Sequence, residues 1–208
     1  MRTPVLTTNG RGLKANGQWL RAEVCAVLLF LTAAAAAESP GRLWVRIQDE
    51  QGRPLAARIY LSDAQGTPRI PSGSVARQAR TREYYFHADG AFQLEAPPGR
   101  LTIEAVKGFE YLPAKTQAAV VSEQTTAATL TLRRLADMPS SGWYSGDVHI
   151  HPNHVLGGLY INMDDCLLLA KGEDIHVSTL LAGSVGVLAH VFDTEHFNDG
   201  KADPLSTP

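Results

Sequence analysis

Short runs in which apolar and polar residues alternate follow one another from Arg42 to about Leu135. Residues i, i+2 and i+4 of a strand share one face of a sheet, so this alternation predicts half-buried strands. Gly, Asp and Pro separate the runs at near-regular spacing, which is typical of an antiparallel β-sandwich. The polar stretch 67–82 is expected to be a long loop. The expected strands are 43–47, 57–61, 84–86, 92–95, 101–106 and 126–132.

A different pattern begins after Pro139-Ser140-Ser141, a short polar joint that we interpret as a domain boundary. A strand is expected at 142–151 and a second apolar strand at 175–181. Between them, Asn162 suits the cap of a helix and Gly172 suits its end. Strand, helix and strand in this order predict a βαβ unit with parallel pairing and a right-handed crossover.

The first of these two strands carries candidate chemistry. Asp147, His149 and His151 alternate with apolar residues and are expected to project from one face of a buried strand. Two imidazoles and a carboxylate that converge can offer lone pairs to one ion, which indicates a divalent-metal site. Hydrogen-bonded structural histidines are the alternative interpretation. Six of the seven histidines follow residue 148, so any chemistry is expected in the C-terminal third.

The sandwich segment resembles a known family in its turns, which read Gly52-Arg53-Pro54-Leu55, Asp89-Gly90-Ala91-Phe92 and Pro97-Pro98-Gly99-Arg100. These turns are similar to those of carboxypeptidase regulatory-like domains of the transthyretin-like type. The resemblance implies a compact sandwich attached to an extracellular enzyme. A ligand surface is one interpretation of several arginines and tyrosines here, and ordinary solvated strand faces are the other. These residues are Arg46, Arg58, Arg100, Tyr84 and Tyr85.

The stretch from Gly142 to His151, Gly-Trp-Tyr-Ser-Gly-Asp-Val-His-Ile-His, resembles the opening of PHP-type metallohydrolases, particularly the CehA/McbA-like branch. The resemblance implies a distorted β/α barrel that holds two or three divalent ions, Zn, Mn or Fe. It implies hydrolysis of phosphoesters or related esters by a metal-activated water. His149 and His151 would be metal ligands, and Asp147 would orient one imidazole or be a ligand itself.

The chain departs from that family's pattern at three places. The loop 152–158 replaces a Ser-Asp-Gly-like loop, where His154 is either a substitute ligand or an exposed histidine. Leu181-Ala182-Gly183-Ser184 stands where the family often has Thr-Asp-His. Asp193, Glu195 and His196 either complete a site or belong to a polar surface loop. Only 68 residues, 141–208, remain for a barrel that needs roughly 200, so we expect an incomplete, truncated barrel domain.

The N-terminal residues 1–37 have the features of a secretory signal peptide. Basic residues precede an apolar run, 24–37, and cleavage is expected near Ala37. An uncleaved anchor is the alternative, although the run is shorter than the ~18 residues of a spanning helix. After cleavage only Cys166 remains, which excludes an intramolecular disulfide. The predicted location is therefore secreted or periplasmic, without stable membrane insertion.

Composition narrows the possible partners. The formal net charge of −2 gives no electrostatic case for nucleic acid. The expected organisation is a signal peptide at 1–37, a sandwich domain at 42–135 and a partial metallohydrolase domain at 141–208.

Three hypotheses about function follow from this organisation. The first is a secreted metal-dependent hydrolase of the PHP type, acting on a small-molecule or ester substrate. The second is a non-catalytic extracellular binding module with a vestigial metal site. The third is a small domain with a structural metal held by His149, His151 and His154. The sequence leaves open whether this chain is an enzyme, and it leaves open the oligomeric state.

Overall fold

The computed structural model of the protein describes residues 38–78, 83–150 and 163–180. Strands dominate these ranges, which contain a single α-helix. The elements in chain order are β1 (Gly41–Gln48), β2 (Ala56–Asp63), β3 (Arg77–Gln78), β4 (Tyr84–Asp89), β5 (Ala91–Ala96), β6 (Gly99–Val106), β7 (Tyr111–Leu112), β8 (Ala114–Val120), β9 (Thr125–Thr131), β10 (Arg133–Arg134), the 3-10 helix η1 (Pro139–Ser141), β11 (Gly146–Ile150), α2 (Met163–Gly172) and β12 (Val177–Leu180).

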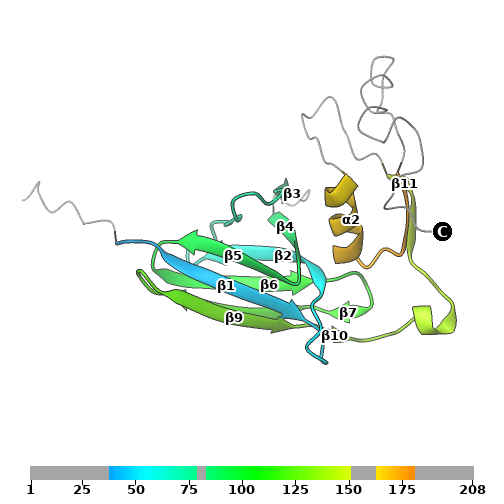
Figure 1. Ribbon diagram of the computed structural model, residues 1–208, viewed down its shortest axis with the longest axis horizontal. Helices are drawn as coiled ribbons and strands as arrows, with labels where there is room; N and C mark the ends of the chain where they lie inside the picture. Colours follow the sequence, from blue (N-terminus) through cyan, green and yellow to red (C-terminus); the bar gives the residue numbers. More distant parts are fainter. Residues whose placement is uncertain (1–37, 79–82, 151–162, 181–208) are drawn as a thin grey trace, which may run out of the picture. The chain divides into compact units, whose positions relative to one another are not determined.

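Two sheets form the β-sandwich (Figure 1). One has the strand order β5-β1-β9, and the other has the order β3-β4-β2-β6-β8. Their inner faces share one hydrophobic core, because alternate residues of each strand point toward the opposite sheet. In β1, for example, Leu43, Val45 and Ile47 are fully buried, whereas Arg42 and Arg46 are exposed.

Aromatic packing joins neighbouring strands within this core. The ring of Phe86 is fully buried and meets Phe92 edge to face, with the ring centroids 5.0 Å apart. This geometry places the positive edge of one ring against the negative face of the other. The contact thereby links β4 in one sheet to β5 in the other across the core.

The structure confirms each of the six strands expected from the alternating pattern, as β1, β2, β4, β5, β6 and β9. It adds β8, whose inward positions are small or only moderately apolar, with Ala118 and Val120 the buried ones. The expectation of an antiparallel sandwich is wrong in one respect, because β1 and β9 pair in parallel, with Leu43 opposite Thr126. Alternation identifies a strand's faces but says nothing of its direction.

The βαβ unit is present, and its strands pair in parallel as expected, with Gly146 opposite Val177. The expected incomplete α/β barrel of the PHP type is wrong: the described ranges contain this two-stranded sheet and α2 but no part of a barrel wall beyond them. Parallel strands of a barrel are buried on both faces. Here Val148 is 74% exposed and Val177 is 54% exposed. The strand at 146–150 is therefore an exposed strand and not the buried one that its sequence predicts.

Helix α2 packs against β2 and β4 of the sandwich. Its closest approach is at Gly172, where a Cβ atom would overlap the ring of His87. Within the described ranges, no helix is long and apolar enough to cross a membrane. The expected signal peptide and its cleavage near Ala37 lie outside these ranges.

Candidate ligand-binding site

Two acidic residues that follow α2 fix the βαβ unit to the sandwich. Glu173 Oε1 lies 2.8 Å from His87 Nε2 on β4 and 3.5 Å from Arg58 Nε on β2. Burial alone would raise the pKa of Glu173, but the His87 hydrogen bond and the charges of Arg58, His87 and Lys107 together lower it. The carboxylate is therefore held in its charged form between two sandwich strands.

Asp174 makes the second connection. Its Oδ1 lies 3.3 Å from Lys107 Nζ, and its Oδ2 lies 3.8 Å from Arg134 Nη2. The Lys107 ammonium also donates to the backbone carbonyl of Lys171, in the last turn of α2. Asp174 has a left-handed backbone, with φ of 56°, which Asp tolerates better than most residues. A Cβ atom on Gly108 would lie 2.6 Å from the Cβ of Asp174, so this glycine permits the close approach.

Arg134 links the end of the sandwich to the segment before β11. Its Nη1 donates to Glu110 Oε2 at 2.6 Å, and its Nε donates to the Tyr111 hydroxyl at 3.0 Å. The guanidinium also lies 4.5 Å from the centroid of the Tyr111 ring. Glu110 Oε2 accepts the backbone N–H of Met138 at 3.2 Å. These contacts hold the chain at Met138, just before η1, against β7 and β10.

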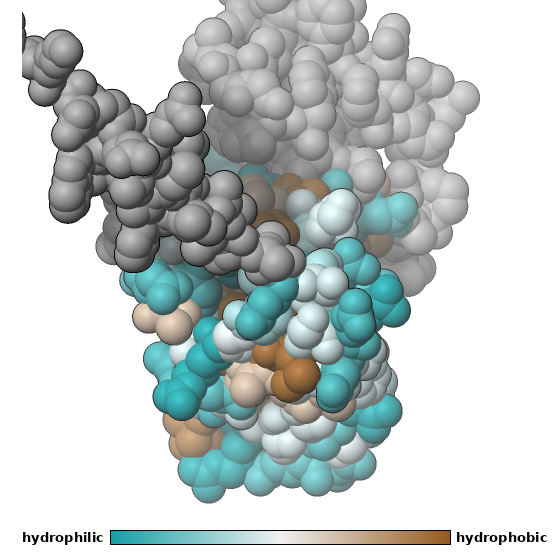
Figure 2. Space-filling view, turned by 90° about the vertical axis from the view of Figure 1, so that its left-hand side faces the viewer, coloured by the Kyte–Doolittle hydropathy of each residue, from teal (hydrophilic) through white to brown (hydrophobic). Residues whose placement is uncertain are grey.

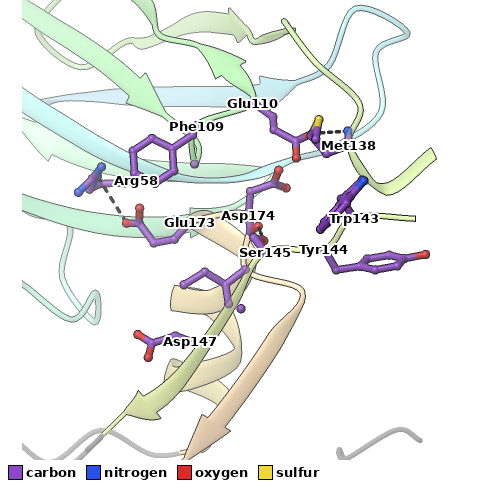
Figure 3. Close-up of a pocket in the computed structure, with 13 residues that line it drawn as sticks. Arg58, Phe109, Glu110, Met138, Trp143, Tyr144, Ser145, Asp147, Glu173 and Asp174 are labelled. Carbon is purple, nitrogen blue, oxygen red and sulfur yellow. Dashed lines mark hydrogen bonds and ion pairs between the residues drawn. The ribbon is translucent and has the colours of Figure 1, made fainter. Parts of the chain in front are cut away.

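A pocket of about 580 Å³ opens beside these contacts. In the view of Figure 3, Trp143 and Tyr144 lie on one side of the Glu110 and Asp174 carboxylates, and Phe109 lies on the other. The remaining lining residues are Arg58, Gly108, Met138, Ser145, Gly146, Asp147, Glu173 and Ile175. The volume is within the range of about 300–1,000 Å³ that is usual for small-molecule sites.

The exposed apolar side chains of the described ranges concentrate around this pocket. Nine large hydrophobic residues are exposed there, and four of them line the pocket, namely Phe109, Met138, Trp143 and Tyr144. By contrast, Figure 2 shows a side of the sandwich that is mostly hydrophilic, with small separate hydrophobic groups near its middle and at its lower left edge. Clustered exposed aromatic surface is a mark of an interaction site, whereas scattered single residues are ordinary.

Hydrogen bonds and ring packing fix one wall of the pocket. The Ser145 hydroxyl donates to the Asp174 carbonyl and lies 2.8 Å from His176 Nδ1. The ring of Tyr144 packs edge-on against His176, with centroids 5.7 Å apart. Which of the Ser145 hydroxyl and the His176 Nδ1 donates in their contact depends on the tautomer of the imidazole.

The residues expected to hold a metal are only partly within the described ranges. Asp147 Oδ1 accepts the backbone N–H of His149 at 3.0 Å, a local turn contact. His151, His154, Asp193, Glu195 and His196 lie outside these ranges. Among the described residues, no three His, Cys, Asp or Glu side chains are grouped so as to hold a metal ion. The divalent ion expected at His149 and His151 stays a prediction.

The arginines and tyrosines considered as a possible ligand surface on the sandwich do not form one site, which agrees with the alternative interpretation of ordinary strand faces. Arg58 does line the pocket, and its guanidinium stacks near Tyr60 and Tyr85 at 5.8 and 5.5 Å. Arg46 instead lies over Trp44, on the outer face of the other sheet. Phe109 was not predicted as a site residue, and Trp143 and Tyr144 were noted only as part of a family pattern. Aromatic residues flanked by Gly and Ser in polar joints were the available signal.

Comparisons with known proteins give little to set beside this geometry. No family model matches the chain, and no curated protein matches it. One similar solved structure is a minor pilin of the Gram-positive pathogen Streptococcus agalactiae, with 17% identity and a TM-score of 0.38. The match covers 49% of this chain and 47% of that one, so the chain spans about half of the pilin's length.

These findings correct the family and function expected from the sequence. Both resemblances, to PHP-type metallohydrolases and to carboxypeptidase regulatory-like domains, are wrong: no family model matches the chain, and the described ranges hold a two-stranded sheet with one helix where a barrel was expected. The expectation of a metal-dependent hydrolase is wrong as well, because the described ranges hold neither a barrel nor a metal-ligating group. The Gly-Trp-Tyr…His-x-His pattern misled because it is short and gives no information about the elements that follow it.

Proposed function

We propose that the chain is a non-catalytic extracellular binding module, and that its ligand binds in the pocket between the sandwich and the βαβ unit. The observation that carries the proposal is the exposure of three aromatic rings around one cavity. Phe109 is fully exposed, Trp143 is 69% exposed and Tyr144 is 62% exposed. A ligand that covered these rings would remove a large apolar area from water.

The rigid surroundings of the pocket also support binding. Glu173 and Asp174 hold one wall through four cationic or imidazole groups of the sandwich, and Glu110 holds the segment that leads to Trp143. A wall fixed before the ligand arrives loses little conformational entropy on binding.

The extracellular location is part of the same proposal. It rests on the basic residues, apolar run and small-residue end of segment 1–37, which are typical of a signal for export. The site of action is accordingly proposed to be the periplasm or the cell exterior. Mass spectrometry of the protein recovered from the periplasm or medium of its host would test this, by showing whether the chain begins after Ala37.

A fragment screen tests the binding proposal. The purified full chain would be screened by ligand-observed NMR against a library of neutral, cationic and anionic small molecules, beside the double variant Trp143→Ala/Tyr144→Ala. Both rings are exposed, so their removal is expected to leave the fold intact. Trp44→Ala is the matched control, because this tryptophan lies on the sandwich face formed by β1. We expect hits that the double variant loses and the control keeps.

The result that contradicts the proposal is equally definite. If no fragment distinguishes the wild-type protein from the double variant while circular dichroism shows both folded, the pocket is not a binding site. Each hit would also be recovered after incubation. Hits that are recovered unchanged agree with a binding module, and conversion of a hit to products would contradict the non-catalytic part of the proposal.

A further inference from the structure

We infer that the pocket selects a small organic cation, an ammonium group that carries apolar substituents. This inference rests on the proposed binding function and adds the chemical class of the ligand. It is drawn from the balance of charge around the pocket, from the exposed aromatic faces and from the size of the cavity.

The side chains that line the pocket carry a net negative charge. Four carboxylates line it, from Glu110, Asp147, Glu173 and Asp174, against one guanidinium, from Arg58. Groups behind the lining compensate part of this charge, since Arg134 pairs with Glu110 and Lys107 pairs with Asp174. Arg58 itself pairs with Glu173.

Asp147 is the lining carboxylate that pairs with none of these three cations. Its one contact within residues 38–78, 83–150 and 163–180 is the backbone N–H of His149, and no cationic side chain of those ranges lies within ion-pair distance. The pocket therefore carries about one uncompensated negative charge. A ligand with a single positive charge would complement it, whereas an anion would be repelled.

The aromatic rings add to the same preference. The face of an aromatic ring carries the negative end of its quadrupole and attracts a cation, most strongly for Trp. Trp143, Tyr144 and Phe109 are exposed and line the cavity (Figure 3). An ammonium with methyl or larger apolar substituents satisfies both features, because its charge faces the rings and its carbon atoms cover their apolar surface.

Ligand size follows from the cavity. A volume of about 580 Å³ is far more than one methylated ammonium group fills. The ligand is accordingly expected to extend from its ammonium group by an apolar or hydroxylated arm. Choline is a simple probe of this class, and dimethylbutanol is its uncharged carbon isostere.

Isothermal titration of the full chain with choline and with dimethylbutanol tests the inference. Choline is expected to bind at least fivefold more tightly than its isostere. Asp147→Asn is expected to weaken choline about fivefold and to leave dimethylbutanol unchanged, because the pair it breaks is solvent-exposed. The matched control is Asp164→Asn, an exposed aspartate on α2 that does not line the pocket, and it is expected to change neither affinity.

Each other outcome overturns the inference. Equal affinities for the two probes, or a choline affinity that Asp147→Asn does not change, would show that the pocket does not select for charge. The binding function would still stand if neutral fragments from the screen competed for the pocket and were lost with Trp143→Ala/Tyr144→Ala. If neither probe bound and the screen gave no hits, both proposals would fall together.

Discussion

Lys107 Nζ lies 3.3 Å from Asp174 Oδ1, and the two side chains are only 8% and 10% exposed. Lys107 directly follows β6 of the sandwich, and Asp174 lies in the turn that follows α2. This nearly buried ion pair connects the two parts of the structure that together form the pocket. A buried charge that loses its partner is costly, because water cannot replace the lost interaction.

The first prediction concerns this ion pair. Lys107→Met should lower the free energy of unfolding by about 2 kcal/mol, less than the loss of an isolated buried pair because Arg134 stays near Asp174. Asp174→Asn should act similarly, since Asn also tolerates the left-handed backbone at this position. The double variant should cost less than the sum of the two, as measured by urea unfolding. Strict additivity would show that the pair is not coupled.

A surface ion pair provides the control for that experiment. Arg42 and Glu95 lie 3.2 Å apart across β1 and β5, with side chains 53% and 67% exposed. Pairs of this kind contribute only about 0–1 kcal/mol. Arg42→Met should therefore change the free energy of unfolding much less than Lys107→Met does.

The second prediction concerns the contact between α2 and the sandwich. Gly172→Ala should destabilise the protein by about 1–3 kcal/mol, because the added methyl group overlaps the ring of His87. Helix propensity alone predicts the opposite sign, a gain of up to about 1 kcal/mol. Thermal unfolding of Gly172→Ala in the wild-type protein and in a His87→Ala variant would separate the two effects. In the His87→Ala background, the extra methyl group should cost little.

The third prediction concerns acid. The folded-state pKa of Glu173 lies below its ordinary value of 4.5. Burial raises this pKa, but the hydrogen bond with His87 and the charge of Arg58 outweigh burial and lower it. A depressed carboxyl pKa contributes stability that is present above pH 4.5 and is lost as the pH falls through the folded value. Glu173→Gln removes this contribution. Its free energy of unfolding should therefore fall less than that of the wild-type protein between pH 6 and pH 3.

The contribution of Glu173 to the pH dependence of stability must be distinguished from the contributions of other carboxylates. The pKa values of Asp49 and Asp63 are also lowered, because hydrogen bonds from Arg53 and from Thr67 and Arg69 outweigh desolvation. Both residues are present in the wild-type protein and in Glu173→Gln, so their contributions cancel in the difference. Parallel stability curves for the two proteins would show that Glu173 does not contribute to the acid sensitivity.

The fourth prediction uses Cys166 as a reporter of α2 docking. This residue is 6% exposed, and burial with the nearby Asp165 charge raises the pKa of its thiol to about 11. In a Cys25→Ala background, it is the one remaining cysteine of the chain. Its reaction with a disulfide reagent at pH 8 should be slow when the protein is folded and fast in urea.

Docking variants provide the comparison. Lys107→Met and Gly172→Ala should both increase the rate at which Cys166 reacts under native conditions, since each loosens α2 from β2 and β4. Arg42→Met should leave the rate unchanged. A rate that stays the same in every variant would mean that the contacts of Glu173 and Asp174 do not hold α2 in place.

The sandwich strands were predictable because their burial follows their own alternation. Each inward residue of β1, such as Val45, is apolar, and the outward residues, such as Arg46, are polar except for Trp44. Strand direction was not predictable, because the parallel pairing of β1 with β9 depends on how the chain returns between them. Strand β8 was missed because its inward Ala118 is a weak hydrophobic signal.

The pocket was less predictable than the fold. Phe109 and Glu110 are far from Asp174 in the sequence, and the three meet only because α2 docks on the sandwich. Local patterns singled out Asp147, which does line the pocket, and His149, but they predicted a buried metal site, whereas their strand is exposed and belongs to a two-stranded sheet. A pattern of alternating ligands indicates which side chains share a face, but it does not show what encloses that face.

The central claim, that the pocket binds a ligand, is tested most directly by NMR of the tryptophan side chains. The chain has three tryptophans, at positions 19, 44 and 143, and each indole N–H gives its own signal in the nitrogen-labelled protein. On titration with the best fragment hit, the Trp143 signal should move and saturate, whereas the Trp44 signal should stay in place. No movement of the Trp143 signal at saturating ligand, or equal movement of both signals, would contradict the account.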